Sequence, residues 1–227
     1  MQNLQFIIDA FTKSRNIHIS ILDVNGILNT SSTKIDFKNI IHSKSFCDIA
    51  KSTEKGYRYC LCCKDLANTK AITSKKPFCG HCVYGILEAA FPVITNETVV
   101  AIVYVGNAVV DTTHTKNIIE KACRYTHVDK QKLYEQMNKC EYVDTADELM
   151  GIAEIIGDYI KMLYRTNTKE ATKHHWLVSV LKQHAEQINS STPTLRELAI
   201  NYHKNEKYMG RLLKKEMGIT FHQYCLS

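Results

Sequence analysis

The longest apolar run in the chain, Thr98 to Val105, constrains its fold more than any other feature. The run has the length of one β-strand and is rich in β-branched residues, which favour strands. It is far shorter than the roughly 18 apolar residues that a membrane-spanning helix needs. A second apolar run, Leu87 to Ile94, precedes it, and the turn residues Thr95-Asn96-Glu97 join the two. Since Gly106 closes the second run, the segment predicts an antiparallel hairpin.

Another hairpin is predicted near the N-terminus, where Ile17 to Leu22 alternates and Asn25-Gly26 supplies a turn before Ile27-Leu28. Apolar residues at helical spacing precede it within Met1 to Ser14, and a helical, cysteine-bearing segment follows from Phe37 to Ser74. Two hairpins with helices packed between them predict an α+β sensory domain with an antiparallel sheet.

After Asp111 the apolar spacing becomes helical. Helices are predicted over Lys116 to Arg124, Asp129 to Asn138 and Asp147 to Leu163. The last of these carries an apolar stripe, made of Leu149, Ile152, Ala153, Ile156, Ile160 and Leu163. Such a stripe packs either in the core or at the seam of a homodimer.

The chain has 227 residues, which is long enough for two small domains. We expect a sensory domain over residues 1–164, a polar linker over residues 165–172 and a second domain over residues 173–227. The formal net charge is +6, and Arg165 to Ser227 holds ten basic against five acidic residues, an excess of five. This local excess predicts a nucleic-acid-binding surface, with an ordinary solvated basic face as the alternative.

The C-terminal segment has the pattern of a helix-turn-helix. An amphipathic helix from Trp176 is followed by helices over Leu195 to Tyr202 and Glu206 to Met217. Thr194 and Glu197 form a capping box before the second of the three. Asn205 is a candidate N-cap and Gly218 a candidate C-cap of the third helix. That helix is expected to bury Tyr208, Met209, Leu212 and Leu213.

Five residues of the third helix are the candidate DNA-binding residues: Lys207, Gly210, Arg211, Lys214 and Lys215. A guanidinium can read guanine edges, lysines bind phosphates, and a glycine leaves space at the closest approach. A helical hairpin with a basic solvated face is the alternative, because helix-turn-helix patterns are easily mimicked.

Leu195 to Ala199, together with Asn205 to Tyr224, resembles the first half of an AraC-type DNA-binding domain, over roughly residues 173–227. The resemblance implies structural roles for Tyr208, Leu212 and Gly218. It implies that Lys207, Gly210 and Arg211 lie where the protein approaches the bases. The family carries two helix-turn-helix units, so the resemblance implies an incomplete DNA-binding domain.

The chain has nine cysteines. The first residues, Met1 to Arg15, lack the pattern of a signal peptide, so we expect a cytoplasmic protein whose thiols stay reduced. Two Cys-x2-Cys pairs, Cys60/Cys63 and Cys79/Cys82, are separated by fifteen residues. This spacing is typical of zinc sites and also suits an iron–sulfur cluster. Buried thiols that pack as small hydrophobic groups are the alternative.

Several motifs within roughly Ile7 to Asp111 resemble a PocR-type sensory domain. They are Phe46-Cys47, Gly56-Tyr57, Cys60-x2-Cys63, Pro77-Phe78, the segment Cys82 to Glu88, and Pro92. The resemblance implies a PAS-like pocket for a small hydrocarbon derivative such as a short diol, and matches the family cysteines to Cys47, Cys60, Cys63 and Cys82. Val83 replaces a family histidine. The expected pocket residues are Phe46, Cys47, Cys82, Tyr84 and Glu88.

For a metal site, the same resemblance leaves two candidates for the fourth ligand. Cys60, Cys63 and Cys82 would be joined by Cys47 or alternatively by Cys79.

Catalysis is not expected. His81 adjoins Cys82, but neighbours on a strand point to opposite faces, and the motifs of common hydrolases and nucleotide-binding enzymes are missing from the sequence.

We therefore predict a ligand-responsive transcription regulator that binds a small-molecule effector and double-stranded DNA, with no membrane association and with homodimerisation open. Two alternatives are a cysteine-based metal or redox sensor, and an interaction fragment without DNA binding.

Overall fold

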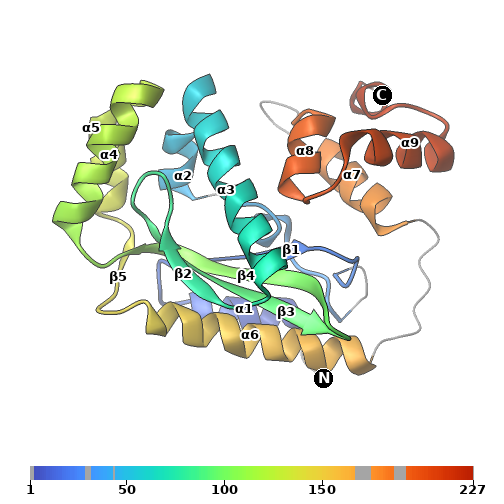
Figure 1. Ribbon diagram of the computed structural model, residues 1–227, viewed down its shortest axis with the longest axis horizontal. Coiled ribbons are helices and arrows are strands. Elements are labelled where there is room, and N and C mark those ends of the chain that lie inside the picture. The colour runs from blue at the N-terminus through green and yellow to red at the C-terminus, as the bar shows by residue number, and fades with distance from the viewer. Residues whose placement is uncertain (1–2, 29–31, 43, 167–174, 187–192, 227) are drawn as a thin grey trace. The chain divides into compact units, whose positions relative to one another are not determined.

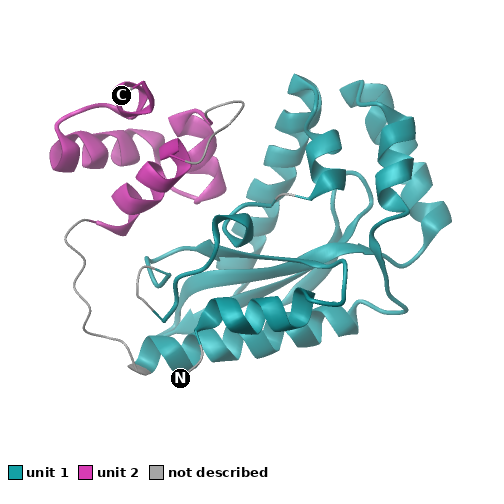
Figure 2. Ribbon diagram, turned by 180° about the vertical axis from the view of Figure 1, so that it is seen from behind, with its two compact units in different colours: residues 1–168 teal, residues 169–227 magenta. Residues whose placement is uncertain are grey.

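The computed structural model describes residues 3–28, 32–42, 44–166, 175–186 and 193–226 (Figure 1). The chain divides into two compact units, residues 1–168 and residues 169–227 (Figure 2). Of the expected linker, Arg165 and Thr166 are the last residues of helix α6, and residues 167–172 lie outside the described part.

The first unit is built on an antiparallel sheet with the strand order β1-β4-β3-β2. Its strands are β1 (His18–Asp23), β2 (Phe78–His81), β3 (Leu87–Thr95) and β4 (Thr98–Val109), and the short β5 (Glu141–Tyr142) runs parallel to the end of β4. The predicted β3–β4 hairpin is confirmed: Thr95 pairs with Thr98. Asn96 and Glu97 have φ of 46° and 60°, as a two-residue type I′ turn requires.

The predicted N-terminal hairpin is wrong. β1 pairs along its whole length with the central strand β4 and not with Ile27-Leu28. The carboxylate of Asp23 accepts the backbone N–H groups of Gly26, Ile27 and Leu28 at 2.6, 3.0 and 3.0 Å. Because a side chain satisfies these groups, the segment turns without needing a second strand.

Helices cover both faces of the sheet (Figure 1). They are α1 (Leu4–Thr12), α2 (Ser45–Ala50), α3 (Glu54–Ser74), α4 (Thr112–Thr126), α5 (Lys130–Met137) and α6 (Asp147–Thr166), with a 3-10 turn at Phe37–Asn39. The helices expected around 116–124, 129–138 and 147–163 are confirmed as α4, α5 and α6. None of the helices in the described part combines the length and apolar character needed to cross a membrane.

One face of the sheet packs against α1 and α6, and this is the main core. The six apolar stripe residues of α6 are all buried there, so the stripe is part of the core. Along β3, Leu87, Ala89 and Val93 point to this face. Since side chains alternate on a strand, Glu88 and Ala90 point to the other face, which α3 covers.

The described part of the second unit contains four short helices: α7 (Trp176–Glu186), α8 (Leu195–Asn201), α9 (Glu206–Met217) and α10 (Phe221–Cys225). The capping box of Thr194 and Glu197, the Asn205 N-cap and the Gly218 C-cap are all present. Met209 and Leu213 are buried as expected. Tyr208 is not: it is 42% exposed, because its neighbour Met209 occupies the buried face of α9. Helix α10 was not predicted.

Candidate functional site

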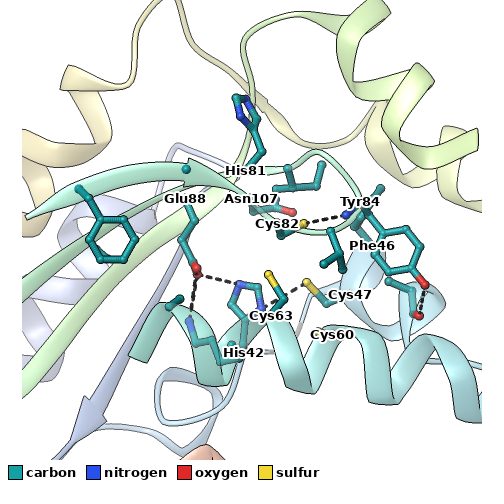
Figure 3. Close-up of a pocket in the computed structure, with 18 residues that line it drawn as sticks. His42, Phe46, Cys47, Cys60, Cys63, His81, Cys82, Tyr84, Glu88 and Asn107 are labelled. Carbon is teal, nitrogen blue, oxygen red and sulfur yellow. Dashed lines mark hydrogen bonds and ion pairs between the residues drawn. The ribbon is translucent and has the colours of Figure 1, made fainter. Parts of the chain in front are cut away.

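A cavity of about 100 Å³ lies between α3 and the sheet of the first unit (Figure 3). Its walls come from α2, α3, β2, β3, β4 and the loop that joins β2 to β3. All five expected pocket residues line it, namely Phe46, Cys47, Cys82, Tyr84 and Glu88. The residues that the resemblance implied come from two segments of the sequence, Phe46-Cys47 and Cys82 to Glu88, and the fold brings both segments to one cavity.

Local structure explains how these side chains reach the cavity. On α3, Cys60, Cys63, Lys64 and Ala67 follow the spacing of one helix face, and all four line it. On β3, strand alternation directs Glu88 toward the cavity. A Cβ atom on Gly106 of the neighbouring strand would lie 3.1 Å from Cγ of Glu88, so the glycine provides the space for that side chain.

The polar end of the cavity is a connected group of four side chains. The carboxylate of Glu88 accepts hydrogen bonds from Nζ of Lys64, which lies 3.3 Å from both oxygens. Its Oε1 also lies 3.2 Å from Nε2 of His42. The other ring nitrogen of His42, Nδ1, is 3.7 Å from Sγ of Cys47. Lys64 additionally places its ammonium 3.1 Å from the ring centroid of Tyr104.

These contacts shift the protonation of the group. Burial raises the pKa of Glu88, but the charges of Lys64 and His42 outweigh it and lower the pKa to about 2. Burial lowers the pKa of His42, but the negative charges of Cys47 and Glu88 raise it to about 9. Burial raises the pKa of Cys47, whereas the His42 imidazolium lowers it, and the result is a lowered pKa. The contacts thus favour the carboxylate of Glu88, the imidazolium of His42 and the thiolate of Cys47.

The remaining cavity thiols behave differently. Burial raises the pKa of Cys60 to about 11 and also raises the pKa values of Cys63 and Cys82. The sulfur of Cys82 accepts the backbone N–H of Tyr84 at 3.4 Å. These cysteines are therefore protonated, small and largely apolar parts of the wall at neutral pH.

The cysteines do not form the four-ligand site that their spacing suggests. In the described residues, no group of three or more His, Cys, Asp or Glu side chains is arranged to hold a metal ion. Cys79 does not line the cavity at all. Because it alternates with Phe78 and Gly80 on β2, its side chain packs in the core on the α6 side of the sheet, where Sγ lies 3.8 Å from the carbonyl oxygen of Ala146.

Sequence reasoning missed three polar residues of the cavity, His42, Lys64 and Asn107. Lys64 could have been found, since it lies one helical turn after Cys60 on the same face of a predicted helix. His42 gave no signal, because it lies in an irregular segment before α2 with no motif around it.

In the second unit, a basic face follows α9. Lys207, Arg211, Lys214 and Lys215 are exposed on this helix. Gly210 does not have the expected outward position. A Cβ atom there would lie 3.2 Å from Cδ2 of Leu195, so the glycine allows α9 to pack closely on α8.

Comparison with known proteins identifies the first unit. A family model described as the sensory domain found in PocR matches residues 1–168. Searches of curated proteins and of solved structures gave no match. The match covers the whole unit that contains the cavity. The chain therefore belongs to the family of PocR sensory domains.

Proposed function

We propose that this protein is a ligand-responsive transcription regulator. Its first unit binds a small molecule in the cavity, and its second unit binds double-stranded DNA through α9. The observation that carries the proposal is the cavity itself: it lies within the sensory domain, and residues from α2, α3 and β3 converge on it.

The cavity suits a small, weakly polar effector such as a short diol. About 100 Å³ holds only a molecule of a few non-hydrogen atoms. Apolar wall residues such as Phe46, Ala50 and Ile86 would contact its carbon chain. Glu88 and His42 would bind a hydroxyl group, since a few placed polar groups in an apolar pocket fix the orientation of a ligand.

Thermal denaturation with a panel of two- to four-carbon alcohols and diols tests this site. A ligand at about 100 times its Kd stabilises a protein by about 2.7 kcal/mol. Ala67→Leu adds bulk to the cavity wall and should abolish that stabilisation. Leu66→Ala is the matched control on the same helix, because Leu66 is 70% exposed and outside the cavity. Equal stabilisation of wild type and Ala67→Leu would place the ligand elsewhere.

The proposal assigns α9 as the recognition helix of a helix-turn-helix formed with α8. Support comes from the close packing of the two helices at Gly210 and from the exposed cations beside it. Lys207 and Arg211 would approach the bases, and Lys214 and Lys215 the phosphates. A guanidinium and three ammonium groups on one exposed face also give binding that weakens with salt.

Arg211→Ala should weaken binding to a selected operator by about 1–3 kcal/mol. Lys121→Ala removes one exposed cation from the first unit and is the charge-matched control. The operator is first selected from random duplexes, and affinity is then measured by fluorescence anisotropy over a salt series. Equal losses for the two variants would show that only net charge matters.

A further inference from the structure

We infer that Cys47 is a nucleophile that binds a small aldehyde covalently and reversibly in the cavity. The inference rests on the proposed function, because it takes the cavity as the ligand site and specifies the chemical class of the ligand. The series of contacts from Cys47 through His42 to Glu88 carries it (Figure 3).

The geometry is that of an activated thiol. The imidazole of His42 lies between the thiol of Cys47 and the carboxylate of Glu88. Its Nδ1 is 3.7 Å from Sγ of Cys47, and its Nε2 is 3.2 Å from Oε1 of Glu88. A cysteine becomes nucleophilic when a histidine, itself oriented by an acid, stabilises its thiolate. Glu88 is here a positioning residue, held in turn by Lys64 at 3.3 Å.

The segment that carries His42 is also held in place. Nζ of Lys51 donates a hydrogen bond of 2.8 Å to the carbonyl oxygen of His42. The ring of His18 lies against that of His42, with centroids 5.4 Å apart, and its Nε2 is 3.0 Å from the carbonyl oxygen of Ile41. Both the ring and the backbone at this position are therefore fixed relative to Cys47.

The charges around Cys47 favour the thiolate. The titratable groups that face it or its partner His42 are His18, His42, Lys51, Cys60, Cys82, Glu88 and Cys140. Burial raises the pKa values of Cys60, Cys82 and Cys140, so these thiols add no negative charge at neutral pH. Burial lowers the pKa of His18 to about 3, which leaves that ring neutral. Burial and the negative charge of Glu88 raise the pKa of Cys47, but the positive charges of His42 and Lys51 lower it, and the net shift is downward.

The proposed step is an addition to a carbonyl group. The thiolate sulfur of Cys47 forms a bond to the aldehyde carbon, and the π electrons of the C=O bond move to its oxygen. That oxygen takes the proton from Nδ1 of His42. The product is a neutral thiohemiacetal beside a neutral imidazole whose Nε2–H still donates to Glu88. No oxidant or leaving group is needed, and the reverse step releases the ligand.

The cavity selects for size and chemistry together. Its volume of about 100 Å³ admits only a short carbon chain, and Phe46, Ala50 and Ile86 supply apolar contacts. An alcohol of the same length has no electrophilic carbon, so it would bind without forming a bond. An aldehyde forms the covalent bond in addition. The neighbouring thiols of Cys60 and Cys82 lie in the same cavity, so their reactivity can be compared with that of Cys47.

The first test is carbon-13 NMR of the reduced full-length chain with [1-13C]acetaldehyde. A new thiohemiacetal resonance is expected in the wild type and in the control Cys62→Ser, because Cys62 is exposed and lies outside the cavity. The resonance should be missing in Cys47→Ser. An adduct that persists in Cys47→Ser, or no adduct in a wild type that binds acetaldehyde, overturns the inference. Circular dichroism establishes that each variant is folded.

Ethanol, as the matched alcohol, separates this inference from the proposed function. If acetaldehyde binds no more tightly than ethanol, and Cys47→Ser binds both as the wild type does, covalent binding is overturned. The cavity then remains as the ligand site. An adduct on Cys47 that leaves DNA affinity unchanged supports the inference and contradicts the proposed regulation. If acetaldehyde does not bind but a diol of the panel does, the inference is overturned and the proposed function remains. If no molecule of the panel binds, the result contradicts both proposals.

The second test measures the thiolate without any ligand. Iodoacetamide alkylation, followed by peptide mass spectrometry, should modify Cys47 about tenfold or more faster than Cys60 at neutral pH. His42→Gln should remove that advantage and move the pH profile of Cys47 alkylation toward that of an ordinary thiol. Equal rates for Cys47 and Cys60 in the wild type would overturn the inference.

Discussion

Glu88 is the residue on which the charges in the cavity depend. Its carboxylate is 16% exposed and is paired with both Lys64 and His42. Removing it leaves two cations close together in a largely buried site, and the loss of one partner from a buried ion pair costs about 3–5 kcal/mol. The carboxylate therefore stabilises the fold of the first unit and positions His42 at the same time.

Glu88→Ala should lower the free energy of unfolding of the first unit by about 3 kcal/mol or more. Glu54→Ala is the matched control, because Glu54 pairs with Arg58 on the surface with exposed fractions of 78% and 75%. That exposed pair should contribute less than about 1 kcal/mol. Urea unfolding followed by far-ultraviolet circular dichroism measures both, and losses of the same size would contradict the role given to Glu88.

His184 makes the stability of the second unit depend on pH. Its Nε2 lies 2.8 Å from the hydroxyl oxygen of Tyr202, and burial lowers its pKa from 6.5 to about 4. The neutral ring is preferred in the folded state, so its contribution is complete above pH 6.5. That contribution, up to about 3 kcal/mol, is lost as the pH falls toward 4.

The fluorescence of Trp176 can follow this loss in the second unit alone. It is the only tryptophan of the chain, and its ring lies 6.4 Å from that of Tyr202. Urea midpoints read from this signal should fall between pH 6.5 and 4 in the wild type and change less in His184→Gln. Parallel pH dependence of the two proteins would rule out His184 as the cause.

Only some of the residues that line the cavity could be predicted from the sequence. Cys47, Cys82 and Glu88 were found because they lie in recognisable motifs. His42 reaches Cys47 and Glu88 only through the path of an irregular segment, which no periodic pattern specifies. Cys79 was a candidate metal ligand beside the cavity cysteines, but its side chain lies on the other face of the sheet. The spacing of cysteines in the sequence says nothing about which face of β2 a side chain occupies.

Among helices and strands, the apolar pattern predicted an element correctly where the patterned segment was long. The β3–β4 hairpin and α6 were predicted because each buries one continuous apolar run or stripe. The N-terminal hairpin failed because the signal at Asn25-Gly26 is local, whereas the partner of β1 is a strand some eighty residues later. Strand β2 has four residues and α10 has five, too few to show a period.

The packing of α6 on β3 leads to a prediction about two glycines of one helix. A Cβ atom on Gly157 would lie 2.5 Å from Cδ1 of Phe91, whereas one on Gly151 would meet nothing within 4 Å. Gly157→Ala should therefore destabilise the first unit by about 1–3 kcal/mol. Gly151→Ala should stabilise it by about 0.5–1 kcal/mol through helix propensity. Thermal unfolding compares the two, and a stabilising Gly157→Ala would mean that Phe91 moves aside at little cost.

The proposed regulator needs coupling between its two units, so that ligand binding in the first changes DNA binding by the second. A ligand shifts the DNA-binding state only if it binds one state more tightly than another. Sequence could indicate the two units, through the basic excess after Arg165 and the change of apolar spacing, but it holds no information on how they communicate.

Energetic coupling between effector binding and operator binding is reciprocal. If a saturating effector changes operator affinity by a factor of about 5–150, bound operator must change effector affinity by the same factor. Arg211→Ala should weaken operator binding and leave effector affinity of the DNA-free protein unchanged, because α9 is remote in sequence from the cavity and belongs to the other unit. Ala67→Leu should do the reverse. Isothermal titration of each ligand with and without the other completes the cycle. Operator affinity that stays constant while the cavity fills would separate the two activities and leave a sensory domain whose output is something other than DNA binding.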